Sequence, residues 1–381
     1  MNFELTEEQQ MVRNAVREFA ENEIAPVARE YDEAEKFPRT QLEGLAELGL
    51  LGMIIPEEYG GAGFDSVSYA LALEEIARAD SSVAVIVSVT NSVCCYPILS
   101  YGTEDQKLKY LVPLAKGEKL GAFCLSEPQA GSDAANQKTR AALNGNSYVL
   151  NGTKSWVTNG GEADVYLTMA VTGEKDGRKE ITAFLVESES EGLAVSSVEH
   201  KMGQRASKTC EMSLTDVKVP KENVLGEPGN GLKVAFSSLD NGRIGIAALS
   251  VGIAQAALEE AKNYSKDRIA FGKPISEFQA IQHKLADMAT SVEAARLLTL
   301  RAAAAKDAGN KQSGIYASMA KLFASETANK VCAEAVQIHG GNGFSRHYNV
   351  EKYYRDARIT TIYEGTSEMQ RIVISRGILK D

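Results

Sequence analysis

Residues 362–371 read IYEGTSEMQR and place one carboxylate, Glu364, between an aromatic residue and a Gly-Thr-Ser turn. Because a turn alone could use any small polar residue, this glutamate needs a separate explanation. It could be a charge at a helix start, a solvated surface group, or a general base. The last role requires a pKa raised by partial removal from water, so the rest of the chain must decide among the three.

A second polar segment, GAFCLSEPQAGSD, occupies residues 121–133. Pro128 and Gly131 predict an extended loop, in which backbone N–H groups and the hydroxyls of Ser126 and Ser132 are free to bind a planar, polar ligand. An ordinary turn that links two domains is the alternative.

The only tryptophan, Trp156, lies in NGTKSWVTNGG at residues 151–161. Thr158 follows two positions later and therefore shares a strand face with it. The pair could form one wall of a cofactor site, although a lone tryptophan also often fills a hydrophobic core.

Two further places carry glycines or charges of the kind found in nucleotide sites. HGGNGF at residues 339–344 has a GGxG spacing but follows a helical stretch rather than a strand, which does not fit a dinucleotide fold. A helix cap and turn is the alternative there. Arg268 near Phe271, and Asp240 with Arg243, place single charges at expected helix ends, where a phosphate could bind or where water alone could solvate them.

Three parts of the chain must position these residues. Apolar residues recur at three- and four-residue spacing in the first third, which predicts an all-helical domain over residues 1–121. A Thr-Glu-Glu-Gln run at residues 6–9 is expected to start its first helix. Pro113 and Gly117 are expected to end a short helix near the end of this domain.

Between residues 122 and 230 the period changes to two, and Asn-Gly pairs at 151–152 and 159–160 signal hairpins. This pattern predicts an antiparallel β-barrel or sandwich domain. Long helical stretches with apolar stripes return over residues 231–381 and predict a four-helix bundle. The expected fold class is therefore α+β and multidomain, with a cleft where the sheet meets the two helical parts.

Composition limits the possible functions. A net charge of −10 argues against a surface for nucleic acid or anionic membrane. The five cysteines show no CxxC spacing, so neither a disulfide framework nor a metal site is suggested. The acid-rich amphipathic start does not resemble a secretory signal or transit peptide, and no apolar run approaches the roughly 20 residues of a membrane span. We therefore expect a cytoplasmic protein that binds neither nucleic acid nor membrane.

Taken together, the segments are similar in order and spacing to the acyl-CoA dehydrogenase family along essentially the whole chain. Those that carry the resemblance are GAFCLSEPQAGSD, NGTKSWVTNGG, LDNGRIG, DRIAFGKPISEFQAIQ, QIHGGNGF and YRDARITTIYEGTSEMQR. The stretch VSVTNSVCCYPIL, the SEP of the first segment and LDNGRIGIAA resemble the short-chain, butyryl-type branch. The resemblance implies FAD-dependent oxidation of a short-chain acyl-CoA, with butyryl-CoA the expected substrate, to a trans-2-enoyl-CoA. It also implies electron transfer to an electron-transferring flavoprotein and a homotetramer built as a dimer of dimers.

The resemblance assigns most of the polar segments to FAD. The run from Phe123 to Ser132 matches the strand and loop along the flavin ring. Trp156 and Thr158 match residues at the other edge of the ring, with Thr158 near N5. Arg268, Phe271 and Gln279 match positions that reach the FAD of a neighbouring subunit. The full set of matching cofactor positions is Phe123, Leu125, Ser126, Gly131, Ser132, Trp156, Thr158, Arg268, Phe271, Gln279, Gln337, Gly340, Gly341, Thr366 and Glu368.

On the acyl-CoA side, the matching positions are Ser132, Asp240, Arg243, Tyr363, Gly365 and Arg376. Glu364 matches the family's catalytic base, which removes the α proton of the thioester while a hydride passes from the β carbon to flavin N5. The resemblance further implies that the thioester carbonyl accepts hydrogen bonds from the Glu364 backbone N–H and from a ribityl hydroxyl. Ile362, Tyr363 and the acyl chain would supply the apolar surroundings that raise the pKa of a carboxylate.

Gln129 and His339 stand where many relatives carry smaller or apolar residues, and their effect on the flavin site stays open. The same chemistry in reverse would make an enoyl-CoA reductase, and direct reaction with oxygen would make an acyl-CoA oxidase. A non-catalytic, DNA-associated flavoprotein of the same fold is a third alternative, but it would need a basic C-terminal face rather than Glu364. The position of that glutamate argues against isovaleryl-type members, and the uncharged stretch at 81–89 argues against a dicarboxylic substrate.

Acyl length depends on residues 87–99. If they form a helix, Val89, Val93 and Tyr96 or Pro97 recur on one face and would close the end of a narrow acyl tunnel. A closed tunnel predicts specificity near about four carbons, because longer chains would displace well-packed side chains. The alternative is a helix that packs only into the N-terminal core.

Overall fold

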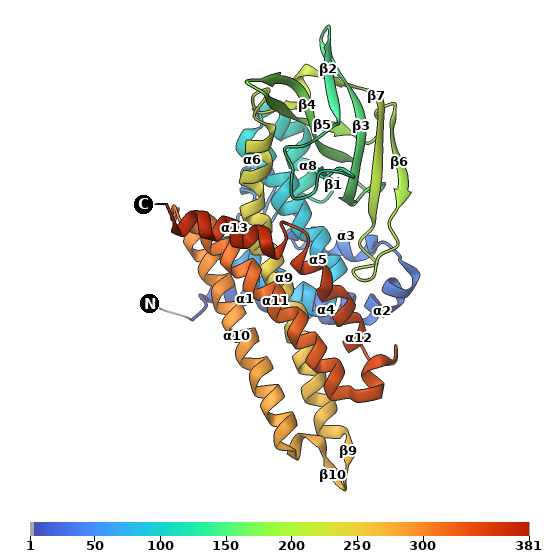
Figure 1. Cartoon of the computed structure of the whole chain (residues 1–381), viewed down its shortest axis with the longest axis vertical. Coiled ribbons are helices and arrows are strands. Elements are labelled where there is room, and N and C mark those ends of the chain that lie inside the picture. Colours follow the sequence, from blue (N-terminus) through green and yellow to red (C-terminus); the bar gives the residue numbers. More distant parts are fainter. Residues whose placement is uncertain (1–3, 381) are drawn as a thin grey trace.

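A computed structural model describes residues 4–380, and it places a sheet-rich part at one end of two helical parts that pack together (Figure 1). The helical parts come from the beginning and the end of the sequence, blue to cyan and yellow to red in the figure, and the sheet comes from the middle. The α+β class with its helical, sheet and helical order is therefore confirmed.

The first part is helical throughout, and the predicted start of its first helix is confirmed. The Thr6 hydroxyl accepts a hydrogen bond from the Gln9 backbone N–H (3.2 Å), and the Gln9 side chain accepts one from the Thr6 N–H (3.1 Å), which is a capping box. The elements are α1 Glu7–Phe19, η1 Ala20–Ile24, α2 Ala25–Ala34, α3 Arg39–Glu47, η2 Leu50–Gly52, η3 Glu57–Tyr59, α4 Ser66–Ala79, α5 Ser81–Val89, η4 Thr90–Cys95, α6 Tyr96–Tyr101, α7 Glu104–Gln106, η5 Lys107–Leu111 and α8 Val112–Ala115.

Three of these segments, η1, η4 and η5, are π-helical, and each directly precedes an α segment with proline at its second position. The prolines are Pro26, Pro97 and Pro113. A π turn shifts the hydrogen-bond register, so the N–H that proline lacks is not needed at that point. The expectation that Pro113 ends its helix is therefore wrong, whereas the helix does stop before Gly117, whose φ is +73°.

The middle part forms one eight-stranded sheet with the order β6-β7-β3-β2-β4-β5-β8, and β1 pairs with β4 off this path. Most pairings are antiparallel, as predicted, but β1 and β4 run parallel, and β2 touches β4 in the same sense. The elements are β1 Gly121–Cys124, β2 Arg140–Asn144, β3 Ser147–Thr158, β4 Val165–Lys175, β5 Arg178–Glu187, β6 Leu193–Val198, β7 Thr209–Pro220, η6 Lys221–Asn223 and β8 Val224–Leu225.

The last part consists of three long helices followed by two shorter ones. The elements are α9 Gly231–Asp267, β9 Ile269–Ala270, β10 Lys273–Pro274, η7 Ile275–Glu277, α10 Gln279–Asp307, α11 Ser313–His339, η8 Gly340–Phe344, α12 Val350–Arg358, η9 Ile359–Thr361 and α13 Ser367–Ile378. The long helix α9 packs against α10, α11 and also α4 of the first part. The short β9–β10 hairpin lies at the end of the molecule remote from the sheet (Figure 1).

One hydrophobic core joins the first and last parts. Leu45, Leu73 and Ile86 from the N-terminal helices share it with Ile244 and Val331 from the C-terminal ones. A second core lies between helices and sheet, and a third lies within the sheet itself. The site residues near α9 therefore rest on a continuous, closely packed support.

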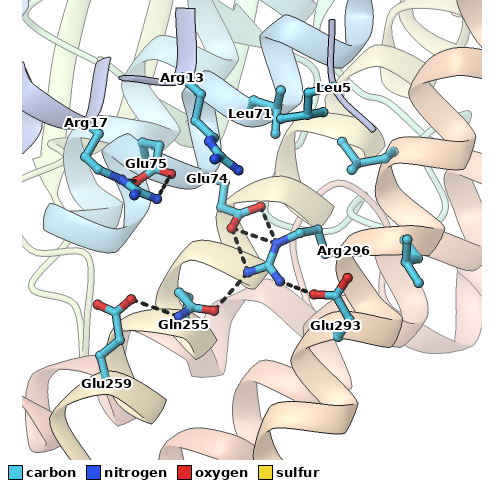
Figure 2. Close-up of a pocket in the computed structure, with 12 residues that line it drawn as sticks. Leu5, Arg13, Arg17, Leu71, Glu74, Glu75, Gln255, Glu259, Glu293 and Arg296 are labelled. Carbon is cyan, nitrogen blue, oxygen red and sulfur yellow. Dashed lines mark hydrogen bonds and ion pairs between the residues drawn. The ribbon is translucent and has the colours of Figure 1, made fainter. Parts of the chain in front are cut away.

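A charged network also joins the helical parts (Figure 2). The Arg296 guanidinium of α10 donates to Glu74 of α4 at 2.9 and 3.0 Å, and to Gln255 of α9 at 2.8 Å. Arg17 of α1 donates to Glu75 at 2.5 and 2.9 Å. Because these residues come from four helices, the network fixes the relative placement of the first helix and the C-terminal bundle.

Two helical stretches are long and apolar enough to cross a membrane by length and composition alone, Ser81–Tyr101 and Gly231–Asp267. The expectation that no apolar run approaches that length is therefore wrong. In both helices most of the apolar window is buried inside the fold, 89% and 78% respectively, as in the core helices of many proteins.

Candidate active site

The segment that carries Glu364 is a strained turn between η9 and α13. Glu364 has φ +53° and Gly365 has φ +88°, so two consecutive residues adopt left-handed backbone conformations. Such a conformation is costly for glutamate and persists only when surrounding contacts hold it. The Thr366 hydroxyl then caps α13 by accepting from the Met369 N–H at 3.3 Å.

The carboxyl group of this turn points at α9. An added Cβ at Gly242 would lie 2.6 Å from Glu364 Oε2, so glycine is what lets the carboxyl group approach the helix. Oε2 is buried and makes no hydrogen bond to any described residue. Burial raises the pKa of Glu364 to about 7, although the positive charges of Arg243 and Lys321 oppose the shift. A carboxylate with that pKa is suited to take and release a proton near neutral pH.

Charged groups surround this carboxyl group on two helices. On α9, Arg243 donates to Asp240 at 2.7 Å. On α11, the Lys321 ammonium group donates to the Gly365 carbonyl at 2.8 Å. The structure thus brings Asp240, Arg243 and Gly365 of the predicted substrate residues together around Glu364.

Tyr363 lies beside Glu364 and connects it to the sheet part. Its hydroxyl accepts from the Gln204 side chain at 3.1 Å, and the Gln204 backbone N–H donates to Asp356 at 2.5 Å. Burial is the main reason that the pKa of Tyr363 is raised, with a smaller contribution from Glu364. The tyrosine is therefore a neutral, fixed neighbour of the carboxyl group.

The helix run α5, η4 and α6 passes next to the same place. An added Cβ at Gly245 would lie 2.5 Å from both the Ser88 and the Tyr69 hydroxyl oxygens, which are 3.3 Å apart. Burial, and to a smaller extent the charge of Glu364, raises the pKa of Tyr69 and of Cys94. The buried stretch predicted to limit acyl length therefore lies within electrostatic reach of Glu364.

A second group of predicted residues lies on and beside strands β1 and β3. Phe123 lies on β1, and Leu125 and Ser126 follow it; the Ser126 carbonyl accepts from the Ser155 N–H on β3 at 2.9 Å. Trp156 has φ +60° at a bulge and is 62% exposed, so the alternative that it fills the core is wrong. Thr158 is partly buried on the same strand, whereas Gly131 and Ser132 are exposed in the loop.

The remaining predicted residues lie elsewhere. Arg268, Phe271 and Gln279 are exposed on and beside the β9–β10 hairpin, at the end remote from the sheet, so one chain does not bring them to the other cofactor residues (Figure 1). Gln337, Gly340 and Gly341 are exposed where α11 meets η8. Glu368 and Arg376 are exposed in the first and last turns of α13.

Gln129 and His339, which stand where smaller or apolar residues were expected, each make local contacts of their own. Gln129 donates to the Glu127 carboxylate at 2.7 Å and thus holds its own loop together. His339 is buried and stacked on Tyr264 with ring centroids 4.1 Å apart, and its Nδ1 lies 2.8 Å from the Ala335 carbonyl. Desolvation lowers the pKa of His339, so this imidazole is neutral at pH 7.

Comparison with known proteins identifies the family. Models of the N-terminal, middle and C-terminal domains of acyl-CoA dehydrogenases match residues 6–118, 122–217 and 229–379. The chain belongs to the acyl-CoA dehydrogenase family. It is therefore an FAD-dependent oxidoreductase.

Individual relatives agree with this assignment. The chain is 47% identical, over all of both chains, to a short-chain specific acyl-CoA dehydrogenase of Clostridium acetobutylicum. Its fold superimposes on butyryl-CoA dehydrogenase from Megasphaera elsdenii with a TM-score of 0.97, at 47% identity over all of both chains. A chain from a structural study of the electron transferring flavoprotein of Acidaminococcus fermentans gives 0.98 and 47%, again over both full chains. An acyl-CoA dehydrogenase from Bacillus anthracis, complexed with FAD, gives 0.92 and 39%, over 99% of this chain and 67% of that one.

The residues of this chain fit an FAD molecule. An exposed indole on a positive-φ residue of β3 offers a flat surface, and positions 131, 340 and 341 have open space where a Cβ would be. Asn159, one residue after Thr158, and Ser367, one residue after Thr366, carry the buried polar atoms Oδ1 and Oγ, which have no partner among the described residues. Orphaned polar atoms of this kind are usually satisfied by a ligand or by water.

Sequence reasoning missed Gly242, Gln204, Lys321 and Gln370, all of which touch the turn or its neighbours. Gln370 lies within the IYEGTSEMQR segment itself, and a glycine inside a long helix is an unusual choice that signals close packing. No local pattern distinguishes Lys321 from other lysines on a helix.

Proposed function

We propose that this acyl-CoA dehydrogenase oxidises short-chain acyl-CoA thioesters, with butyryl-CoA as the preferred substrate, and that Glu364 is its catalytic base. One observation carries the second part: a buried carboxyl group with a pKa near 7 faces Gly242 and has an oxygen without a hydrogen-bond partner. The similarity to butyryl-CoA dehydrogenase and to a short-chain specific enzyme supports the first part.

In this proposal, Glu364 Oε2 removes the proton from the α carbon of the thioester. No described residue accepts a hydrogen bond from the Glu364 backbone N–H, so that N–H is free to donate to the thioester carbonyl and to stabilise negative charge on its oxygen. Arg243 and Lys321 favour the carboxylate before the reaction. The residues on and beside β1 and β3 would hold FAD, which would supply the acceptor for the hydride that leaves the β carbon.

The short acyl length rests on the buried helix run from α5 to α6. Val89 and Val93 are 7% and 1% exposed, and the run packs along α9 beside Gly245. We therefore expect kcat/KM to peak at butyryl-CoA and to fall by octanoyl-CoA, because each extra methylene would have to displace packed side chains at about 1–3 kcal/mol. A maximum at octanoyl- or palmitoyl-CoA would refute the short-chain assignment but not the dehydrogenase chemistry.

The electron acceptor, the oligomeric state and the cellular location are part of the same proposal. Similarity to a chain from work on an electron transferring flavoprotein supports such a protein as the electron acceptor. The exposed apolar side chains of Ile269 and Phe271 both lie on the β9–β10 hairpin and support a homotetramer, because adjoining apolar surface marks a contact more often than scattered residues do. The net charge of −10 and the burial of both apolar helices support a cytoplasmic enzyme without nucleic-acid or membrane binding.

The absorbance spectrum of the purified holoenzyme tests the function directly. Anaerobic addition of butyryl-CoA should bleach the main visible flavin band within the mixing time of a manual experiment. The same addition to Glu364→Gln should leave the band in place. A wild-type spectrum unchanged by butyryl-CoA and by longer acyl-CoA thioesters would refute the proposal.

A further inference from the structure

The turn that carries Glu364 is held by two side chains from different helices. Gln370 of α13 donates from Nε2 to the Glu364 carbonyl at 3.0 Å and to the Gly365 carbonyl at 2.9 Å. Lys321 of α11 donates to the Gly365 carbonyl at 2.8 Å. Three hydrogen bonds therefore converge on two consecutive carbonyls, at the two residues with left-handed backbone conformations.

The Lys321 ammonium group is buried although it makes only one hydrogen bond within the described part of the chain. Its residue is 0% exposed, and the ammonium group has no other hydrogen-bond acceptor among the described residues. A neutral side chain could donate to a carbonyl without the large cost of burying a charge. The positive charge therefore needs a second explanation, and the charge that interacts most strongly with it is that of the Glu364 carboxylate.

Titratable and charged groups from several elements interact with Glu364 and Lys321. The charges that act on Glu364 are those of Arg243 on α9 and Lys321 on α11. Glu364 in turn acts on Tyr69, Cys94 and Tyr363, which lie on α4, on η4 and in its own turn. The charges that act on Lys321 are those of Glu364, Arg243, Glu368 and Glu326. Arg243 is already paired with Asp240, which leaves Lys321 as the cation near Glu364 with no carboxylate hydrogen-bonded to it.

We infer that Lys321 is a positioning residue for the base: through the Gly365 carbonyl it fixes the strained turn, and with its charge it favours the ionised form of Glu364. This inference rests on the proposed role of Glu364 as the base. Two effects follow that differ in kind. The hydrogen bond sets the direction of the carboxyl group, and the charge sets the pH at which that group becomes a base.

Gln370 provides a matched control, because it donates to the Gly365 carbonyl as Lys321 does, donates to the Glu364 carbonyl as well, and carries no charge. Gln370→Met should lower kcat with butyryl-CoA at all pH values and leave the midpoint of the acidic limb of kcat/KM in place. Lys321→Met should also lower kcat but in addition move that midpoint up by about one pH unit, since one unit corresponds to a modest change in charge interaction. Lys321→Arg, which keeps the charge, should restore the wild-type midpoint.

If Lys321→Met fails to fold, Lys321→Gln can take its place, because the glutamine amide can still donate to the Gly365 carbonyl. It should shift the midpoint upward as Lys321→Met does, with a smaller loss in thermal midpoint. A second readout is the kinetic isotope effect with butyryl-CoA deuterated at the α carbon, which should rise in both neutral variants as proton removal becomes slower.

The outcomes separate this inference from the proposed function. If Glu364→Gln is inactive but the neutral Lys321 variants keep the wild-type midpoint and isotope effect, Lys321 is a structural cap and the inference fails alone. If Glu364→Gln still reduces its flavin with butyryl-CoA at near the wild-type rate, the proposed function fails. An upward midpoint shift in Gln370→Met equal to that in Lys321→Met would also overturn the inference, because charge would then be irrelevant.

Discussion

At the scale of single residues, Glu364 combines three features that a surface glutamate does not have. Its backbone is left-handed, its carboxyl oxygen Oε2 is buried without a partner, and a glycine on a neighbouring helix makes room for it. Of the three explanations open from the sequence, a solvated surface group is contradicted by this burial. The negative charge also lies before α13 rather than in its first turn, where Glu368 is found, so a helix-start role does not explain it.

Substitution of the base gives the most direct prediction at this scale. Glu364→Gln keeps the shape of the side chain but cannot accept the α proton, so flavin reduction by butyryl-CoA should slow by roughly 10²–10⁴-fold. Stopped-flow absorbance measures this rate, and retained yellow colour with unchanged butyryl-CoA binding shows that the site is intact. Reduction at a tenth of the wild-type rate would exclude Glu364 as the base.

The same substitution should change how stability depends on pH. The pKa of Glu364 is about 7 in the folded chain and 4.5 in the unfolded reference, so the folded state binds the extra proton between these values. The stabilisation that this proton gives is fully present below pH 4.5 and is lost as pH rises through 7. Glu364→Gln should therefore gain thermal stability relative to wild type at pH 8 and show no such gain at pH 4.5. A difference in unfolding midpoint that is the same at both pH values would contradict the raised pKa.

At the scale of helices and strands, the sequence correctly predicted features that depend only on adjacent residues. The Thr6 capping box and the stop before Gly117 need only adjacent residues, and both are confirmed. The continuation of the helix through Pro113 depends on a π turn, and the parallel pairing of β1 with β4 depends on strands far apart in sequence. The same limit applies to the site, because Lys321 and Gly242 reach Glu364 from distant positions through helix packing. The resemblance to the family pointed to Glu364 as the base, whereas only the fold revealed the residues that hold its turn in place.

The charged network between the helices gives a prediction about stability (Figure 2). Arg296→Met would leave the carboxyl group of Glu74, whose side chain is 11% exposed, without its strongest partner. Loss of one member of a buried pair typically costs about 3–5 kcal/mol, so the thermal midpoint should fall by several degrees.

The double variant Glu74→Leu with Arg296→Met is the matched control, since it removes both charges. It should recover most of the loss, because replacing a whole buried pair by apolar residues is often neutral. Scanning calorimetry on the holoenzyme compares the three proteins. A double variant less stable than Arg296→Met would mean that the other members of the network, and not this pair, carry the effect.

At the scale of the whole molecule, the turn around Glu364 is the place where all three parts of the chain meet. Lys352 of α12 donates to Asp80 before α5 at 3.1 Å and to Asp356 at 2.7 Å. Asp356 in turn accepts from Gln204 of the sheet part, which binds Tyr363 next to the base. The position of Glu364, the proposed base, therefore depends on the mutual placement of the three parts and not on any one of them.

The β9–β10 hairpin carries residues that are suited to contact a second chain. Phe271 at its tip is 95% exposed, and the Arg268 guanidinium has no hydrogen-bond partner among the described residues of its own chain. An exposed ring beside an unpaired guanidinium is typical of the few residues that carry a protein interface. We therefore expect Arg268→Ala to weaken both the tetramer and the retention of FAD, because the proposed partner of this side chain is the cofactor bound by a neighbouring subunit.

Lys266→Ala is the control for this last prediction, since Lys266 is a cation in the last turn of α9 only two residues away and is equally exposed. Gel filtration at decreasing protein concentration, with the ratio of FAD to protein read from the absorbance of each fraction, should show smaller species that have lost FAD in Arg268→Ala but not in Lys266→Ala. The two losses should also occur together, because a cofactor held between subunits cannot dissociate independently of the interface. A monomeric Arg268→Ala that keeps a full complement of FAD would place the whole cofactor site within one chain, and a tetramer that keeps its FAD would remove Arg268 from the site altogether.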